Sequence, residues 1–265
     1  MRPLQIELNA ITVIAAREIV RAVRDWLPFL AFNAFGPVLF LYVLGGSISQ
    51  NLGGDLGYNY LQFALLGLIV GSLSMSTMTS VTSLVQDREN DFTQEIFVAP
   101  ISRYSIILGK IVGGSVTSLV QLVMFFIVAL VMRISLTPLT IAYILLLVPV
   151  ICLSGGALSV LIASIFSSSP KGVDQMVILI TFVQMFLSGA FIPVNNSSGV
   201  LGILAHAMPM TYLVDLLRGL VYQGTPTYSR VVLYSSITDL VIVAASSIVF
   251  FVVGTFLFVR GERNR

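Results

Sequence analysis

Charge-free apolar stretches recur along the chain, and their length is the first feature that the sequence offers. A helix needs about 20 mostly apolar residues to cross the hydrocarbon core of a bilayer. Six stretches without Asp, Glu, Lys or Arg approach or exceed that length, covering residues 27–48, 62–85, 111–132, 139–166, 175–192 and 240–259. The pattern therefore predicts an all-α integral membrane protein with six transmembrane helices in one domain.

Composition agrees with a chain whose main solvent is lipid. Hydrophobic residues make up 57% of the 265 positions and charged residues 10%, with a mean hydropathy of +0.98. Soluble domains carry roughly 25% charged residues. The lone cysteine, Cys152, lies inside an apolar stretch, which excludes an intrachain disulfide and a cysteine metal site. The net charge of +2 gives no reason to expect a nucleic-acid partner.

Lysines and arginines are distributed unequally between the two sides of the predicted spans. Six spans place eleven of the 14 on one side and three on the other, and the three are Arg133, Arg218 and Arg230. Positive residues close to span ends remain in the cytoplasm. We therefore predict a multi-pass plasma-membrane protein with cytoplasmic N and C termini.

Residues 1–26 mix charged and apolar positions and lack the uninterrupted apolar core of a secretory signal. The apolar positions at three- and four-residue steps are Leu8, Ile11, Ala15, Ile19, Ala22 and Trp26, and the basic positions on another face are Arg17, Arg21 and Arg24. This spacing favours an amphipathic helix lying in the membrane interface. A solvated basic leader is the alternative.

Charge is concentrated in residues 86–110, the predicted cytoplasmic loop between spans two and three. Its candidate contact residues are Asp87, Arg88, Glu89, Asp91, Phe92, Glu95, Ile96, Phe97, Pro100 and Arg103. Apolar positions within 91–99 have helical spacing, and proline disfavours helix at the residue before it. A short amphipathic helix in the cytoplasm can dock in the groove of a protein partner. A merely solvated loop is the alternative, although it would leave two phenylalanines in water.

The external segment 193–239 contains two apolar stretches, 200–208 and 210–222, that are too short to span. Two prolines and Gly224 delimit them, which predicts a re-entrant helical hairpin. The candidate residues of this hairpin are Pro193, Pro209, Tyr212, Asp215 and Arg218. An ordinary loop is the alternative. We expect His206 to make a local hydrogen bond rather than serve as a catalytic base.

The sequence lacks the chemistry of nucleotide hydrolysis. Gly109-Lys110 is followed by Ile111 rather than by the Ser or Thr of a phosphate-binding loop. One histidine and one cysteine give no metal site and no nucleophile–base pair. We therefore expect no enzyme activity and no cofactor bound by this chain. The predicted spans also lack the ionisable side chains that ion-coupled carriers place within the membrane.

Hydroxyl and amide side chains are the main polar groups of the predicted spans. The candidates for a transport path or a helix interface are Ser76, Thr77, Ser80, Gln121 and Gln184. Two pairs of glycines, Gly67 with Gly71 and Gly109 with Gly113, would allow helices to approach closely. Helix packing is the commoner use of such residues, and a substrate path is the alternative.

Two motifs resemble the permease subunits of type-2 ATP-binding-cassette exporters, which move drugs, lipids or lipid-linked glycans outward. The first is similar to the coupling-helix loop of that family and comprises Arg88 to Glu95, Ala99-Pro100-Ile101-Ser102-Arg103 and Leu108-Gly109-Lys110-Ile111. The second resembles the fifth span and the external hairpin and comprises Leu187 to Pro193, Met208 to Tyr212 and Asp215 to Gly219.

This resemblance implies how the chain is used. Two copies would join two copies of a separate ATPase that binds ATP and Mg²⁺, and the coupling helix would convey nucleotide-driven closure to the spans. The transporter would then work by alternating access on an amphipathic drug-like, lipid or lipid-linked glycan cargo. The alternative is a non-transporting membrane scaffold or a passive channel whose loop binds a regulator.

Overall fold

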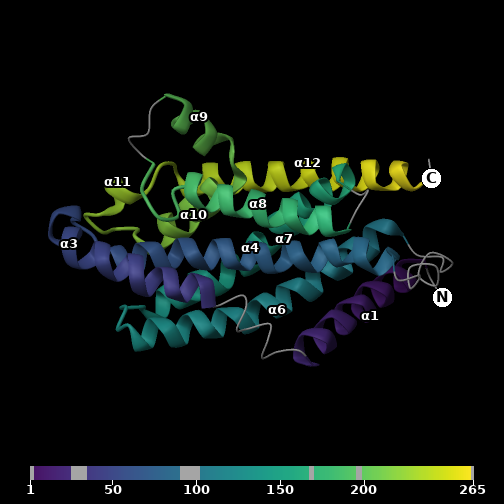
Figure 1. Cartoon of the computed structure of the whole chain (residues 1–265), viewed down its shortest axis with the longest axis horizontal. Helices are drawn as coiled ribbons and strands as arrows, with labels where there is room; N and C mark the ends of the chain where they lie inside the picture. The colour runs from purple at the N-terminus through teal and green to yellow at the C-terminus, as the bar shows by residue number, and fades with distance from the viewer. Residues whose placement is uncertain (1–2, 25–34, 90–101, 167–169, 195–198, 264–265) are drawn as a thin grey trace.

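The computed structural model describes residues 3–24, 35–89, 102–166, 170–194 and 199–263, and these residues form an all-helical bundle. The long helices of this described part run along the bundle (Figure 1) and are α4 (Tyr60–Glu89), α6 (Arg103–Val131), α7 (Pro138–Ile165), α8 (Pro170–Leu187) and α12 (Ser236–Arg263). The start of α1 (Pro3–Arg24) and the end of α12 lie at one end (Figure 1). The opposite end holds α3 (Gly46–Leu56), α10 (Pro209–Val221) and α11 (Tyr228–Val231).

The centre of the bundle is α4. This helix contacts α6, α7 and α8, and most of its side chains between Tyr60 and Val85 are buried. Phe63, Leu66 and Ile69 have no exposed surface. Between Tyr60 and Val85 α4 carries no charged side chain on any face, which suits burial inside a bundle. The apolar side chains of α4 therefore pack mainly against other helices of the protein, and only a few of them can face lipid.

Four helices of the described residues are long and apolar enough to cross a membrane, namely Tyr60–Val85, Tyr104–Val131, Pro138–Ile165 and Tyr228–Arg260. A further pair, α9 (Gly199–Ala207) and α10, is bent by 80° and would make a fifth crossing if it were one broken span. Two of the six predicted spans, 62–85 and 240–259, lie within these helices, and two more, 111–132 and 139–166, extend one residue past the ends of theirs. The chain is thus a multi-pass membrane protein.

The other two predicted spans have a different form. Span 27–48 begins among residues 25–34, which lie outside the described residues, and its described part contains a π-helical turn, η1 (Leu41–Gly45), before α3. The predicted span 175–192 coincides with α8, but that helix ends at Leu187. The chain then turns at Gly189, whose φ of +81° glycine adopts without steric cost. The six-span topology therefore stays a prediction.

Ionisable residues lie inside the long helices, next to the charge-free stretches that the sequence assigns to spans. Lys110, Asp174 and Asp239 each directly precede a charge-free stretch, and α6, α8 and α12 begin before them. Both Lys110 and Asp239 are buried. A prediction from hydropathy ends a span at each charged residue, because it assumes that the charged side chain would face lipid. A bundle interior instead allows ionisable groups to face other parts of the protein.

The predicted amphipathic helix is present as α1, which packs lengthwise against α6. Its contact face differs from the predicted one, because Glu18 is buried together with Ala15 whereas Leu8 is 53% exposed. Val13 and Val20 are also exposed, so the face turned away from the bundle is partly apolar. The position of α1 in the membrane interface stays a prediction.

Glycines set the closest helix contacts, as predicted. A Cβ atom on Gly67 of α4 would lie 2.3 Å from the carbonyl oxygen of Ala190. One on Gly113 of α6 would lie 2.6 Å from the Cβ atom of Glu18. At Gly71 and Gly109 an added Cβ would likewise meet a neighbouring atom below 3.0 Å. At Gly67, Gly109 and Gly113 the missing side chain lets neighbouring segments approach closely, whereas the atoms nearest to Gly71 belong to the flexible side chains of Met210 and Met185.

Replacing Gly67 by alanine is expected to lower the free energy of unfolding by about 1–3 kcal/mol, because the added methyl group meets backbone atoms of Ala190. Gly46 is the matched control, since a Cβ atom there meets nothing within 4 Å and alanine favours a helix. Thermal unfolding in detergent should give a lower Tm for Gly67→Ala and an unchanged or higher Tm for Gly46→Ala. Equal Tm values would contradict the close contact.

Candidate functional site

The predicted coupling loop lies between α4 and α6, and both of its ends are helical. Asp87, Arg88 and Glu89 belong to the last turn of α4, and Arg103 is the first residue of α6. The two helices therefore overlap both ends of the predicted loop 86–110, because each helix continues past its apolar stretch. The other candidates, Asp91, Phe92, Glu95, Ile96, Phe97 and Pro100, lie outside the described residues. The helix expected over 91–99 thus stays a prediction.

The two short helices expected in the external segment are present as α9 and α10, with an 80° bend between them, and their re-entrant, external placement stays a prediction. Pro209 opens α10, where a residue without an N–H group is favourable. Two side chains of α10 bind carbonyl oxygens at the end of α9. The hydroxyl of Thr211 donates to Ala205 (2.5 Å), and the hydroxyl of Tyr212 donates to His206 (2.7 Å). Tyr212 therefore helps to fix the bend by satisfying a helix-end carbonyl.

Arg218 of α10 is buried where three segments meet. Its Nη1 atom donates to the carbonyl oxygen of Gly189 (2.8 Å), and Nη2 donates to those of Ala190 (2.8 Å) and Phe63 (3.0 Å). The guanidinium also lies over the Phe63 ring, with Cζ 3.4 Å from the ring centroid. A planar guanidinium with five N–H donors is suited to several acceptors at once. One side chain thus joins α10 to α4 and to the turn after α8.

Two tyrosines outside the helices border this buried cation. Burial raises the pKa of Tyr222 to about 12, although the nearby Arg218 acts in the opposite direction. Burial also raises the pKa of Tyr58, again opposed by Arg218. Both phenols are therefore neutral at physiological pH. The negative ends of the carbonyl dipoles and the Asp215 carboxylate are left to stabilise the guanidinium.

Asp215 lies one turn before Arg218 on α10 but binds a different segment. Its two carboxylate oxygens accept the N–H of Leu233 (2.8 and 3.0 Å), and one of them also accepts the N–H of Tyr234 (2.8 Å). Both donors lie just before α12. The two charged residues therefore act as separate anchors, with Asp215 binding the start of α12 and Arg218 binding α4.

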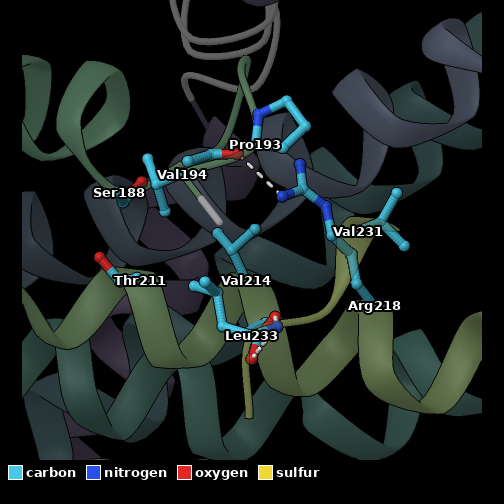
Figure 2. A pocket seen from close by; sticks show the side chains of 10 residues that line it. Ser188, Pro193, Val194, Thr211, Val214, Arg218, Val231 and Leu233 are labelled. Atoms are coloured by element: carbon cyan, nitrogen blue, oxygen red, sulfur yellow. Dashed lines mark hydrogen bonds between the residues drawn. The ribbon is translucent and has the colours of Figure 1, made fainter. Parts of the chain in front are cut away.

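A narrow pocket with a cavity volume of about 10 Å³ lies between these anchors (Figure 2). The residues that line it are Ser188, Gly189, Pro193, Val194, Thr211, Val214, Asp215, Arg218, Val231 and Leu233. Figure 2 shows the Arg218 side chain reaching from α10 toward the segment that carries Pro193. Sites for drug-sized ligands measure roughly 300–1,000 Å³. The pocket is therefore a packing junction of the hairpin rather than a cargo site.

Replacing Asp215 by asparagine is expected to cost about 1–3 kcal/mol of stability, because the NH₂ group replaces one of the two oxygens that accept the Leu233 N–H, so that two donors face each other there. Hydrogen exchange measured by mass spectrometry should become faster at Leu233 and Tyr234 before it changes in the middle of α12. Unchanged exchange at these two residues would contradict the anchoring role.

The polar candidates of the spans lie in contacts between helices of this chain. All five are at least partly buried, namely Ser76, Thr77, Ser80, Gln121 and Gln184. The hydroxyls of Ser76 and Thr77 on α4 lie 3.4 Å and 3.3 Å from those of Thr117 and Ser118 on α6. Within the single chain these two pairs of hydroxyls join α4 to α6. Their use in an assembled transporter stays a prediction.

The described residues offer little for catalysis. The Nδ1 atom of His206 lies 2.5 Å from the carbonyl oxygen of Gly202, one turn away, as expected of a local hydrogen bond. Among the residues that the structure describes, no three His, Cys, Asp or Glu side chains are grouped as a metal site. Cys152 is buried within the main apolar core.

Sequence reasoning missed one buried polar cluster, formed by Glu18, Ser80, Ser83 and Lys110. The signal was present but weak. Glu18 is an acidic residue among the basic ones of α1, and Lys110 directly follows a glycine that permits close helix contact. Neither feature identifies the other as its partner, because 92 residues separate them.

Comparison with known proteins gives a consistent family. Residues 9–222 match the family model described as ABC-2 type transporter. The chain is 30% identical over 106 residues to the Inner membrane transport permease YadH of Escherichia coli (strain K12), covering 40% of this chain and 41% of that protein. Over 189 residues it is 26% identical to ycf38 of Cyanophora paradoxa, covering 69% and 64%. Over 191 residues it is 26% identical to Nodulation protein J of Sinorhizobium fredii (strain NBRC 101917 / NGR234), covering 70% and 71%.

These relatives differ in how much of their length is matched. The chain spans less than half of YadH and less than two thirds of ycf38. The family model, in contrast, extends over most of this chain and includes α4, α6 and the external hairpin. On this match the chain belongs to the ABC-2 type transporter family of membrane transport proteins.

Proposed function

We propose that this chain is the membrane-spanning permease subunit of an ATP-driven exporter whose ATPase is a separate protein. The observation that carries the proposal is a family match over residues 9–222 in a chain without a phosphate-binding loop. Transport against a gradient then needs ATP and Mg²⁺ bound by a partner subunit. The charged segment between α4 and α6, residues 86–110 of the prediction, is the part that we assign to contact with that partner.

In the proposed topology six spans cross the plasma membrane, both termini and the coupling segment are cytoplasmic, and α9 with α10 lies outside. Eleven of 14 basic residues then fall on the cytoplasmic side. The placement of the start of α1 and the end of α12 at one end of the bundle supports this arrangement (Figure 1). A relative named as an inner membrane permease supports the location.

We assign the working transporter two copies of the chain and two ATPase subunits. Large apolar side chains on α6 and α12 are exposed in the single chain, including Leu130 (80%) and Ile237 (77%). Exposed apolar surface on this scale needs lipid or a second copy to cover it. Alternating access would then arise from movement of one copy against the other.

The proposed cargo is an amphipathic drug-like compound, a lipid or a lipid-linked glycan. Apolar and hydroxyl surface is abundant in this chain, whereas its buried charges at Arg218 and Asp215 are occupied by main-chain partners. A path for a large cargo would therefore lie between two copies of the chain. The narrow pocket beside Arg218 would not be part of it.

The proposal is tested by co-expressing the chain with an ATPase encoded beside its gene and reconstituting the purified complex in vesicles that contain a fluorescent phospholipid or an amphipathic dye. We expect a stable complex and movement of one probe that requires ATP. Movement without ATP would favour a passive channel. A complex that moves neither probe and does not change its ATP hydrolysis would favour a scaffold.

A further inference from the structure

A buried ion pair connects α1 to α6 and α4. The Nζ atom of Lys110 on α6 lies 2.5 Å from Oε1 of Glu18 on α1, and the two side chains are 2% and 8% exposed. The same Nζ donates to the hydroxyl of Ser83 on α4 (2.6 Å). The hydroxyl of Ser80 on α4 donates to Oε2 of Glu18 (3.3 Å). Each charged group therefore has an opposite charge and a hydroxyl partner, which is the condition for burying it without a large cost.

The backbone is shaped to bring this pair together. A Cβ atom on Gly113 would lie 2.6 Å from the Cβ of Glu18, and one on Gly109 would lie 2.8 Å from the Cβ of Ile14. Glycine at these two positions of α6 lets α1 lie closely against it on both sides of Lys110. The cluster is thus a fitted junction of three helices.

A second carboxylate of α1 holds the first residues of α6. The two oxygens of Glu7 accept the N–H of Ser102 at 3.0 and 3.1 Å. Ser102 is the N-cap residue of α6, and its hydroxyl accepts the N–H of Tyr104. Glu7 and Glu18 are eleven residues apart, about three helical turns, and so lie on the same face of α1. We call Glu7, Glu18, Lys110 and Ser83 the α1 clamp.

The α1 clamp is attached to the two helices that flank residues 90–101. Ser83 lies near the end of α4, and Ser102 lies at the start of α6. A tilt or rotation of either helix, driven from the segment between them, must carry α1 with it or break the buried pair. Val13 and Val20 on the opposite face of α1 are 68% and 66% exposed, so among the described residues nothing packs on that face to resist such movement.

We propose that α1 is a transmitting element of the transporter, and that Glu18, Lys110 and Glu7 are positioning residues that make it move with α6 when ATP binds to the partner ATPase. This inference rests on the proposed function. A buried ion pair suits the task, because such pairs can fix the register of two helices even where apolar residues would pack as well.

The test follows α1 and α6 separately in the complete complex. Cys152, the only cysteine of the chain, is first replaced by alanine. A single spin label is then attached to a new cysteine, either on α1 (Val13→Cys) or on α6 (Val123→Cys). Both positions are exposed. Spectra are compared without nucleotide and with ATP and vanadate. In the parent complex we expect both labels to change. With Glu18→Gln and Lys110→Met together, we expect the α6 label to change as before and the α1 label to lose its response.

Two further variants keep the result interpretable. Glu7→Gln leaves the buried pair intact and is expected to reduce the response of α1 alone, so it decides the question if the double variant does not assemble. Arg24→Gln, at an exposed residue of α1, is the control and should respond like the parent. Responses of both labels in the double variant and in Glu7→Gln would overturn the inference and leave the proposed function standing. No response of either label in the parent would overturn both.

Discussion

Replacing Arg218 by methionine is expected to cause the largest loss of stability, about 3–5 kcal/mol, because it removes a buried charged group from a site built around it. The change leaves the carbonyl oxygens of Gly189, Ala190 and Phe63 without their donor. It also leaves Asp215 without the nearby cation. Methionine fills similar volume, so the effect reports the lost polar contacts more than a cavity.

Two measurements on the purified protein in detergent test this: the Tm from thermal unfolding and the gel-filtration profile, which reveals aggregation. We expect a strongly lowered Tm or a largely aggregated protein. The matched control is Arg133→Met in the turn after α6, where the arginine is exposed and its loss should be nearly neutral. If both variants unfold at the parent Tm, Arg218 does not join α10 to α4 as described.

Combining Phe92→Ala with Glu95→Lys is expected to have the largest effect on assembly. The two changes remove an apolar anchor and reverse a charge within the segment that we assign to the ATPase contact. Central aromatic and charged residues of an interface each contribute about 2 kcal/mol or more when truncated. Binding of the ATPase should therefore weaken by about a hundredfold or more, while the helices of the bundle keep their stability.

Co-purification and the Tm of the free chain separate these two effects. The control is Gln223→Lys, an exposed position between α10 and α11 at the opposite end of the bundle, which should leave ATPase binding unchanged. A double variant that keeps both complex formation and transport would show that residues 91–99 are not the coupling element.

The pair of short helices α9 and α10 is the part of the structure that was most predictable from sequence. Pro193, Pro209 and Gly224 act locally, through fixed backbone geometry, so their positions indicate where α9 and α10 can begin and end. Glycine pairs were equally informative, because close approach of backbones needs a small residue wherever the partner comes from. The four long apolar helices followed from lipid thickness alone.

The partners of the buried charges could not be predicted in the same way. Arg218 binds the carbonyl of Phe63, 155 residues away, and Lys110 binds Glu18, 92 residues away. Hydropathy reads each such charge as a helix boundary or a loop, whereas the folded chain supplies a partner that turns it into an interior anchor. For the same reason the predicted spans three and five begin directly after Lys110 and Asp174, although these two residues lie inside α6 and α8.

ATP hydrolysis, measured for the purified chain alone and for its complex with the cassette ATPase in lipid vesicles, tests the central claim most directly. The claim is that the chain supplies a pathway while a partner supplies the energy. The account predicts no hydrolysis by the chain alone, and hydrolysis coupled to cargo movement by the complex. Robust ATP hydrolysis by the chain alone would contradict it.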